Sequence, residues 1–371
     1  MYKAILYCAV LIIPLSIVGC GDQRILEKLG FTQTTSYDLL PSENNGQEDK
    51  LMISVSIPKA DPEGQTKRET LTAVSTTSKA AKIMLSRKTE LSLVSGQLRN
   101  TLFGLSLAKK GLWEHIDTLV RDPAISQRVK VTLVNGNAHD LLMKDYLPHP
   151  RTGKYIDRLL EKEGKAQTVP HITLFEFTRD LFDDGIDPVA PMIRAVNDDV
   201  VIDGIALFNE DRYITKIGPD KSLIFSILRG NFKEGELSID LESKGEHVML
   251  SSLISKRKIK VHSSGYNQFS IDINISLKGS ILEYIGDLHL SDEKDRQKLE
   301  NSISDYIQFE TKEMVTKMQK NKVDSLGLGK RIRNSLSYSE WTNLVWKDIY
   351  PNIEVRCNVQ TKIKDYGKFE K

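Results

Sequence analysis

The first hydrophobic block of the chain has the pattern of a leader rather than of a folded core. Met1-Tyr2-Lys3 is short and basic, the run from Ala4 to Ser16 is almost wholly apolar, and Ile17-Val18-Gly19 leads to Cys20. The run is too short for a membrane helix, which needs about 20 apolar residues. A small residue directly before a cysteine is typical of a lipoprotein processing site. We predict a signal peptide over residues 1–19, cleavage after Gly19 and lipidation of Cys20.

The predicted modification explains why a cysteine stands at this position. A thioether to diacylglycerol requires the thiol of Cys20, and acylation of the freed amine adds a further chain. Each buried methylene contributes about 0.8 kcal/mol, so two or three acyl chains hold a protein on a bilayer almost permanently. The alternative is an ordinary secretory signal in which Cys20 is incidental. No second apolar run of membrane length follows, so we expect a water-soluble body tethered to one leaflet.

Behind the leader, apolar residues alternate between helical and strand spacing, which predicts a mixed α/β region over residues 20–198. Strands are expected where every second residue is apolar, at Leu51–Ile57 and Val129–Leu133, and an apolar strand-like segment covers Gln97–Leu107. Helices are expected over Asp22–Gly30, Thr77–Ser86, Gly111–Val120, Ala138–Asp145 and Ile172–Phe182. The pattern leaves open whether this region is one domain or two subdomains.

From Val200 onward strand patterns dominate, so we place a domain boundary near Asp198 and a second domain over residues 199–371. Alternation predicts strands at Val200–Phe208, Leu237–Leu241, Val248–Lys260, Phe269–Leu277 and Ile353–Ile363, with a short helix over Pro219–Leu228. Ser291 followed by acidic residues predicts the cap of one long helix, about 48 Å if it continues to Val323. The predicted fold class is α+β and multi-domain, ending in an antiparallel sheet packed with this helix.

Composition narrows the possible partners and the redox chemistry. The formal net charge is only +2, with no basic surplus of the kind that nucleic-acid binding requires. Of the three cysteines, Cys8 leaves with the leader and Cys20 carries lipid, so Cys357 remains without a disulfide partner. Its position on the inward side of the closing strand predicts a packed, inert thiol. An exported chain without disulfides fits a Gram-positive cell surface or a spore membrane.

No spacing along the chain indicates catalysis. No two of the seven histidines lie three or four residues apart, as zinc sites commonly require. Asp183-Asp184 and Asp198-Asp199 are predicted to be solvated turn carboxylates. Gly327-Leu328-Gly329-Lys330-Arg331 resembles the end of a phosphate loop but lacks its first glycine and its hydroxyl, so we predict a helix exit and a basic turn. We therefore expect no enzyme, no metal site and no cofactor beyond covalent lipid.

Several motifs, in order over most of the chain, resemble the Ger(x)C family, the lipoprotein C subunits of nutrient germinant receptors in endospore-forming bacteria. They are Gly19–Ile25 with Leu29-Gly30, Leu107–Leu112, Asp117–Leu119, Arg121-Asp122, Val131–Ala138, Gly204–Phe208, Leu326–Gly329, Trp341 and Trp346. Two places differ from the family pattern. Gly21 stands where the family has Trp, which removes an interfacial aromatic, and no Glu precedes Ile25.

The resemblance implies a non-catalytic subunit on the outer surface of the spore inner membrane. It implies assembly with two integral membrane subunits, A and B, and a role in receptor assembly and signalling during spore germination. We expect partner contacts at Asp22–Leu29 and at exposed aromatics such as Trp113, although a core role for Trp113 is favoured. The alternatives are a solute-binding lipoprotein of a membrane importer, which would have two similar lobes around a cleft, and a cell-surface hydrolase.

Overall fold

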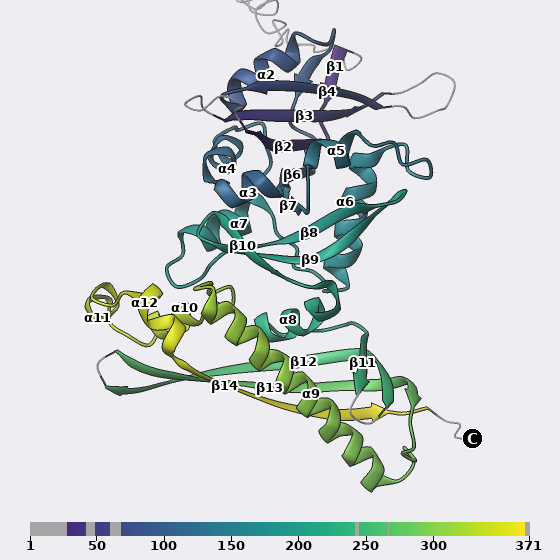
Figure 1. Ribbon diagram of the computed structural model, residues 1–371, viewed down its shortest axis with the longest axis vertical. Helices are drawn as coiled ribbons and strands as arrows, with labels where there is room; N and C mark the ends of the chain where they lie inside the picture. The colour runs from purple at the N-terminus through teal and green to yellow at the C-terminus, as the bar shows by residue number, and fades with distance from the viewer. Residues whose placement is uncertain (1–27, 42–48, 60–67, 242–244, 266, 368–371) are drawn as a thin grey trace, which may run out of the picture.

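The computed structural model describes residues 28–41, 49–59, 68–241, 245–265 and 267–367. The leader, Cys20 and residues 22–27 of the predicted first helix lie outside this part of the chain. The described residues form an elongated body in which two sheets follow one another along the long axis (Figure 1). The predicted α+β, multi-domain fold with a C-terminal sheet and long helix is confirmed.

A mixed sheet of eight strands forms the first half of the body, in the order β10-β9-β8-β7-β6-β2-β3-β4. Its central strands pair in parallel, and its outer strands form antiparallel hairpins. The bounds are β2 (Thr34–Leu40), β3 (Lys50–Pro58), β4 (Arg68–Ser75), β6 (Asn100–Gly104), β7 (Lys130–Val134), β8 (Val189–Val196), β9 (Asp199–Asn209) and β10 (Arg212–Ile217). The strands predicted around Leu51–Ile57, Val129–Leu133 and Val200–Phe208 are confirmed as β3, β7 and β9.

Helices cover both faces of this sheet because its central strands alternate two sets of apolar side chains. On β6, Leu102 packs with Ile156 and Leu160 on one face, whereas Phe103 packs with the larger core cluster that includes Ile116. The helices are α2 (Ser78–Ser86), α3 (Leu105–Lys110), α4 (Trp113–Val120), α5 (Ala138–Met143), α6 (Thr152–Lys165) and α7 (Leu174–Phe182). The predicted strand-like segment Gln97–Leu107 is therefore strand β6 only as far as Gly104 and helical from Leu105 onward.

The prediction of a helix ending at Gly30 is wrong for the described residues. Leu29–Phe31 form strand β1, which pairs in parallel with β5 (Ser92–Val94). A Cβ added at Gly30 would lie 3.1 Å from Leu91 Cβ, so glycine allows a close approach to that segment. The apolar spacing fitted a helix, but pairing with a segment some sixty residues away decides the local conformation.

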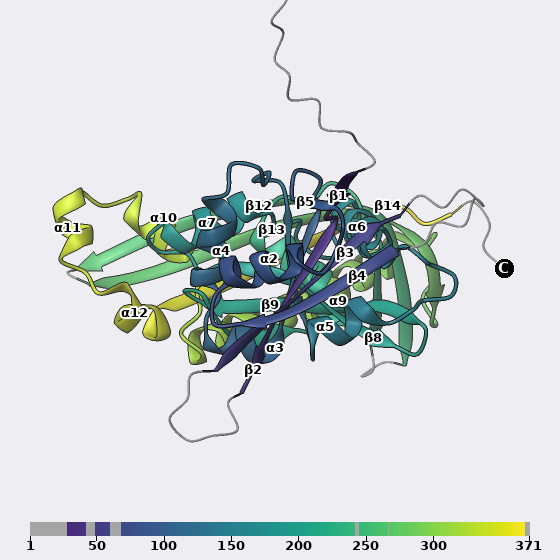
Figure 2. The same ribbon diagram turned by 90° about the horizontal axis from the view of Figure 1, so that it is seen from above.

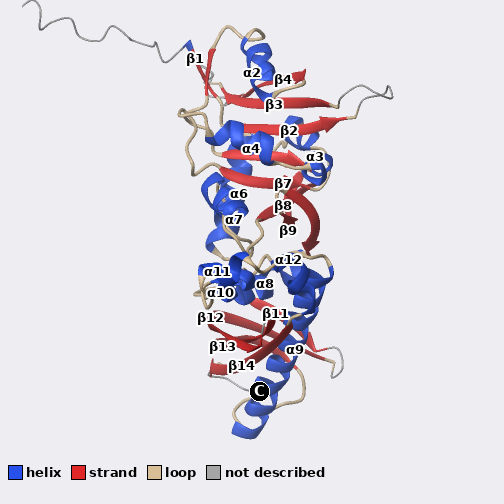
Figure 3. Cartoon of the chain, turned by 90° about the vertical axis from the view of Figure 1, so that its left-hand side faces the viewer, coloured by secondary structure: helices blue, strands red, loops and turns tan. Residues whose placement is uncertain are grey.

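The second sheet has the order β11-β12-β13-β14, and its first three strands form the predicted antiparallel meander. The bounds are β11 (Leu237–Leu241), β12 (Glu246–Gly265), β13 (Gln268–Ile285) and β14 (Glu354–Asp365). Between β13 and β14 the chain passes through the long helix α9 (Glu293–Lys320), which crosses the strands in Figure 3. This return makes β14 parallel to β13, since parallel neighbours need a crossover connection.

The long helix is confirmed, with a different start. Asp292 rather than Ser291 is the N-cap, and its side chain accepts a hydrogen bond from the Lys294 backbone N–H at 2.7 Å. The 28 residues of α9 span about 42 Å at 1.5 Å per residue. Its inward face includes Leu299, Ile303 and Met318, which are fully buried.

Helix α9 also protects the exposed edge of the second sheet. Three side chains on successive turns accept hydrogen bonds from alternate backbone N–H groups of β14: Glu300 from Ile363 at 2.8 Å, Ser304 from Thr361 at 2.9 Å and Gln308 from Val359 at 3.3 Å. Four residues of helix rise about 6 Å, and two residues of strand rise about 6.6 Å, so the two repeats match. An edge strand that would otherwise offer free donors is thereby covered.

The domain boundary predicted near Asp198 falls at the connection between β8 and β9. Hydrogen bonding in the first sheet continues past this point, because β9 pairs with β8 and β10 pairs with β9. The second half of the body begins after β10, with η3 (Pro219–Lys221) and α8 (Ser222–Arg229). The division into 20–198 and 199–371 stays a prediction.

The contact between α9 and the edge of β14 can be tested with one substitution. Ser304→Ala leaves the Thr361 N–H buried without its acceptor, which we expect to lower the free energy of unfolding by about 1–3 kcal/mol. Thr316→Ala is the matched control, because both hydroxyls bond to a carbonyl four residues earlier but only that of Ser304 also accepts from a strand. Urea unfolding measures both changes; equal effects would contradict the edge-cover role.

Candidate functional site

The joint between the two halves is the most elaborate polar site among the described residues. It joins the turn after α7, residues 183–187, to the segment that follows α9, residues 324–333. This segment includes helix α10 (Leu328–Arg333). Helices α11 (Tyr338–Thr342) and α12 (Trp346–Ile349) and then η4 (Tyr350–Asn352) follow it along the chain. Viewed down the long axis, α10, α11 and α12 project to one side of the first sheet (Figure 2).

Asp324 is the central side chain of the joint. It is 2% exposed, and its carboxylate accepts hydrogen bonds from the backbone N–H groups of Leu328 at 2.9 Å and Gly329 at 2.7 Å. The Trp346 Nε1–H donates a third bond at 3.2 Å. Burial raises the pKa of Asp324 to about 7, although all three donors oppose this shift. The carboxylate satisfies the free N–H groups at the start of α10.

Asp187 makes the corresponding bonds from the first half of the body. Its carboxylate accepts from the backbone N–H of Asp324 at 2.7 Å and of Glu210 at 3.1 Å. Its own backbone N–H donates to the Asp324 carbonyl at 2.9 Å. Burial raises the pKa of Asp187 as well. Each half therefore donates to and accepts from the other through a closed set of buried hydrogen bonds.

Two glycines allow the backbones of the joint to touch. Gly185 has φ +84°, and a Cβ there would lie 2.4 Å from the Gly329 carbonyl carbon. A Cβ on Gly329 would lie 2.4 Å from Trp346 Nε1. The Lys330 N–H also donates to the Gly185 carbonyl at 2.8 Å. Side chains larger than hydrogen would force the two halves apart.

The prediction that Asp183 is a solvated turn carboxylate is wrong. It pairs with Lys330 and, at 2.7 Å, with Arg333, so it binds the second half of the body. The pairing lowers the pKa of Asp183 against the opposing effect of burial. Arg333 also donates to the Asp184 carbonyl at 2.8 Å. The other predicted pair is exposed at Asp198, whose side chain is 70% exposed and lies 3.7 Å from Lys144.

The prediction of a helix exit at Gly327–Arg331 is also wrong. Gly327, with φ +68°, is the N-cap of α10, so the segment begins a helix. Its backbone N–H groups already hold the Asp324 carboxylate, which occupies the place an external anion would take at such a helix start. The sequence analysis selected both Asp183 and Gly327–Arg331, but it missed Asp187 and Asp324. These two are 137 residues apart, and no local spacing links them.

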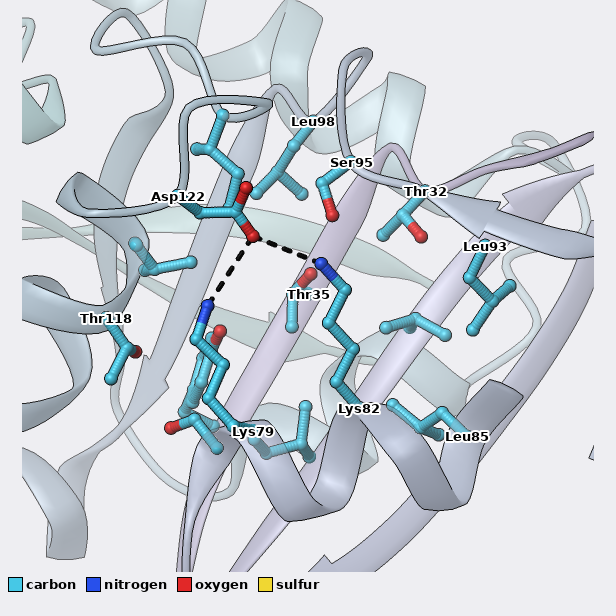
Figure 4. Close-up of a pocket in the computed structure, with 16 residues that line it drawn as sticks. Thr32, Thr35, Lys79, Lys82, Leu85, Leu93, Ser95, Leu98, Thr118 and Asp122 are labelled. Atoms are coloured by element: carbon cyan, nitrogen blue, oxygen red, sulfur yellow. Dashed lines mark hydrogen bonds and ion pairs between the residues drawn. The ribbon is translucent and has the colours of Figure 1, made fainter. Parts of the chain in front are cut away.

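The two hollows next to the joint and to α2 are small, whereas wider hollows of about 1070, 820 and 570 Å³ lie elsewhere on the described surface. The hollow beside the joint has a volume of about 140 Å³. A second cavity of about 60 Å³ lies between α2 and the first sheet, where Lys79 and Lys82 face Asp122 (Figure 4). Ligand pockets usually enclose about 300–1,000 Å³. Within the described ranges, no group of three or more His, Cys, Asp or Glu side chains is arranged to hold a metal.

The remaining residues selected from the sequence have clear positions. Trp113 is half-buried against the main core and meets the exposed ring of Phe182 edge-on, with centroids 4.8 Å apart. Burial raises the pKa of Cys357 to about 11, which disfavours its thiolate at neutral pH. Of the predicted contact segment Asp22–Leu29, only residues 28 and 29 are described. None of the described helices has the length and apolar character needed to cross a bilayer.

Comparison with known proteins identifies the class to which this fold belongs. Residues 22–195 match the family model described as spore germination protein N-terminal domain, and residues 203–367 match the one described as spore germination B3/GerAC like, C-terminal. Spore germination protein GerQC of Bacillus cereus is 26% identical over 364 residues, covering 97% of this chain and 98% of the relative. The chain belongs to the Ger(x)C family of spore germination proteins, the C subunits of spore germination receptors.

A solved structure agrees in fold. The crystal structure of the GerBC protein superposes with a TM-score of 0.55 and 17% sequence identity, covering 92% of this chain and all of that one. The similarity of fold therefore extends over both sheets.

The buried carboxylate of Asp324 should make the free energy of unfolding depend on pH. The ordinary pKa of Asp324 is 3.8 and the folded value is about 7, so the folded chain retains a proton that the unfolded chain releases between these values. The stability from this group is present below pH 4 and is lost as pH rises toward 7, by up to about 1.4 kcal/mol per pH unit. Asp324→Asn should flatten this slope in urea unfolding, whereas exposed Asp198→Asn should keep it. An unchanged slope in Asp324→Asn would refute the assignment.

The close glycine contact gives a second test of the joint. Gly329→Ala places a Cβ against Trp346 and Gly185, which we expect to lower the free energy of unfolding by about 1–3 kcal/mol. Gly230→Ala is the control, because a Cβ there would meet nothing within 4 Å and should change stability by less than about 0.5 kcal/mol. Thermal or urea unfolding reports both. Similar stabilities for the two variants would show that the joint is looser than described.

Proposed function

We propose that this chain is a non-catalytic, lipid-anchored subunit of a nutrient germinant receptor. In this proposal Cys20, freed by cleavage after Gly19, carries diacylglycerol and an N-acyl chain such as palmitate. The body then lies on the outer surface of the spore inner membrane and assembles there with the integral membrane A and B subunits. Its role is receptor assembly and signalling in spore germination.

The observation that carries this proposal is a lipoprotein-type leader followed by a body that matches the germination family over nearly its whole length. Anchoring confines the body to a thin layer, which raises its effective concentration toward membrane partners without any new contact. The polar site that the fold builds also supports a structural role, because its carboxylates are fully used in holding the two halves together. The importer alternative expects a cleft between similar lobes, whereas here the two halves differ and are bonded at their joint.

The anchor is tested by comparing two cysteine variants in spores. Cys20→Ala should abolish incorporation of labelled palmitate and lower the rate of nutrient-triggered germination about tenfold or more, because membrane confinement commonly contributes 10²–10⁴ in effective affinity. Cys357→Ala is the matched control and should retain both the label and the response, since this thiol is half-buried in β14. Limited proteolysis checks that both variants are folded.

Two results would contradict the proposal. One is a full nutrient response from Cys20→Ala, and the other is wild-type protein whose first residue carries no acyl chain in mass spectrometry. Purification of the lipidated protein from spore membranes should also recover the A and B subunits. Their absence from a preparation of folded, lipidated protein would refute the assembly role.

A further inference from the structure

We propose that the outward face of α2 is a second membrane contact, which binds anionic lipid headgroups through its basic side chains and inserts Ile83 among them. This inference rests on the proposed anchor at Cys20, because it concerns how the anchored body meets the bilayer. It adds a surface made by the folded chain itself to the covalent attachment.

The apolar residues of α2 lie on two opposite sides of the helix. Ala81 and Leu85 are buried, one turn apart, where the helix packs against β4. Ile83 lies on the outward side and is 56% exposed, and the neighbouring Met84 is 40% exposed. The fold thus leaves more than half of Ile83 in contact with water. Insertion into a membrane surface would bury it.

Basic residues flank this isoleucine along the helix. Lys79 and Arg87 lie four residues before and after Ile83, so all three fall on one face of α2 or its C-cap. The stretch from Thr70 to Thr89 contains Lys79, Lys82, Arg87 and Lys88 and no acidic residue. A basic helix face with apolar side chains at its centre is the pattern that binds anionic membranes.

The charges of this face are only partly neutralised within the fold. Asp122 pairs with Lys79 at 3.5 Å and with Lys82 at 3.1 Å (Figure 4). Lys88 donates to the Thr72 carbonyl at 2.5 Å. Arg87 is exposed, and no ion pair joins it to any described residue. At least two net positive charges therefore remain available for headgroups.

The position of α2 agrees with a membrane role. It covers β4, the strand that ends the first sheet, and lies at the same end of the body as β1, where the described chain begins (Figure 1). Residues 21–27 are all that separate Cys20 from Lys28, and a chain extends at most about 3.4 Å per residue. An acylated Cys20 therefore keeps the start of β1 within roughly 30 Å of the bilayer. Helix α9 lies in the second half of the body, at the other end from β1 (Figure 1).

Vesicle binding separates this contact from the anchor. The chain from residue 20 with Cys20→Ala lacks acyl chains and should still bind vesicles of equal parts phosphatidylglycerol and phosphatidylcholine better than vesicles of phosphatidylcholine alone. Arg87→Gln should lower the partition coefficient about fivefold, since each basic side chain near an anionic surface contributes about that factor. Ile83→Gln should lower it about fivefold to tenfold, for loss of a partly inserted side chain.

Matched controls come from the opposite end of the body. Phe309 is 61% exposed on α9, and Lys312 is exposed one turn later on the same helix. Phe309→Gln and Lys312→Gln remove the same chemistry there and should change vesicle binding less than twofold. Equal binding by all variants, or equal binding to both kinds of vesicle, would overturn the proposal.

A second measurement uses the complete lipidated protein. A polarity-sensitive fluorophore on Ile83→Cys should shift its emission to the blue on anionic membranes, whereas the same label on Phe309→Cys should report water. If the label at position 83 reports water although the protein is acylated and membrane-bound, the α2 contact is refuted and the proposed anchor at Cys20 is not. A shift that requires the integral membrane subunits would assign this face to a protein partner and also refute it. Unacylated wild-type protein would instead refute the proposed function.

Discussion

The mutual hydrogen bonding of Asp187 and Asp324 is the interaction on which the shape of the molecule depends. A buried carboxylate is costly unless hydrogen bonds satisfy it, and these two are satisfied largely by backbone donors drawn from both halves of the body. Such bonds are directional, unlike apolar contact, so they fix the angle between the sheets as well as their separation. The glycine contact of Gly185 with Gly329 adds a steric limit. The two sheets can change their relative orientation only by breaking several bonds together.

Local patterns predicted much of the fold because they report local physics. Alternation located β3, β7 and β9, and the apolar face of α9 located the long helix. The failures are cases where a distant partner decides. Residues 29–31 pair with β5 instead of continuing a helix, and β14 is parallel because α9 returns the chain to the same end of the sheet.

The candidate site depends even more on partners that are distant in the sequence. Asp183 looked like a turn carboxylate because the residues around it are turn residues, and nothing near it in sequence reveals Lys330 and Arg333. The glycines at 327 and 329 did mark a special backbone, but spacing alone does not tell which anion such a backbone binds. Here the chain supplies the anion itself, from Asp324. The prediction of a leader and a lipidated Cys20, by contrast, rests on a local pattern alone, and it stays a prediction.

The joint also bears on how an anchored body would meet its membrane partners. A single attachment at Cys20, as proposed, would fix the position of one end of the body but not its orientation. Because the joint resists bending, the direction of the whole long axis follows from the contact made at that end. A second contact through α2 would therefore orient the β12–β13 hairpin and α9 as well, although these lie at the other end of the body (Figure 1). This orienting effect depends on both features. If the joint could bend, the second half of the body would not keep the orientation of the first. Without the α2 contact, the whole body could rotate about its attachment at Cys20.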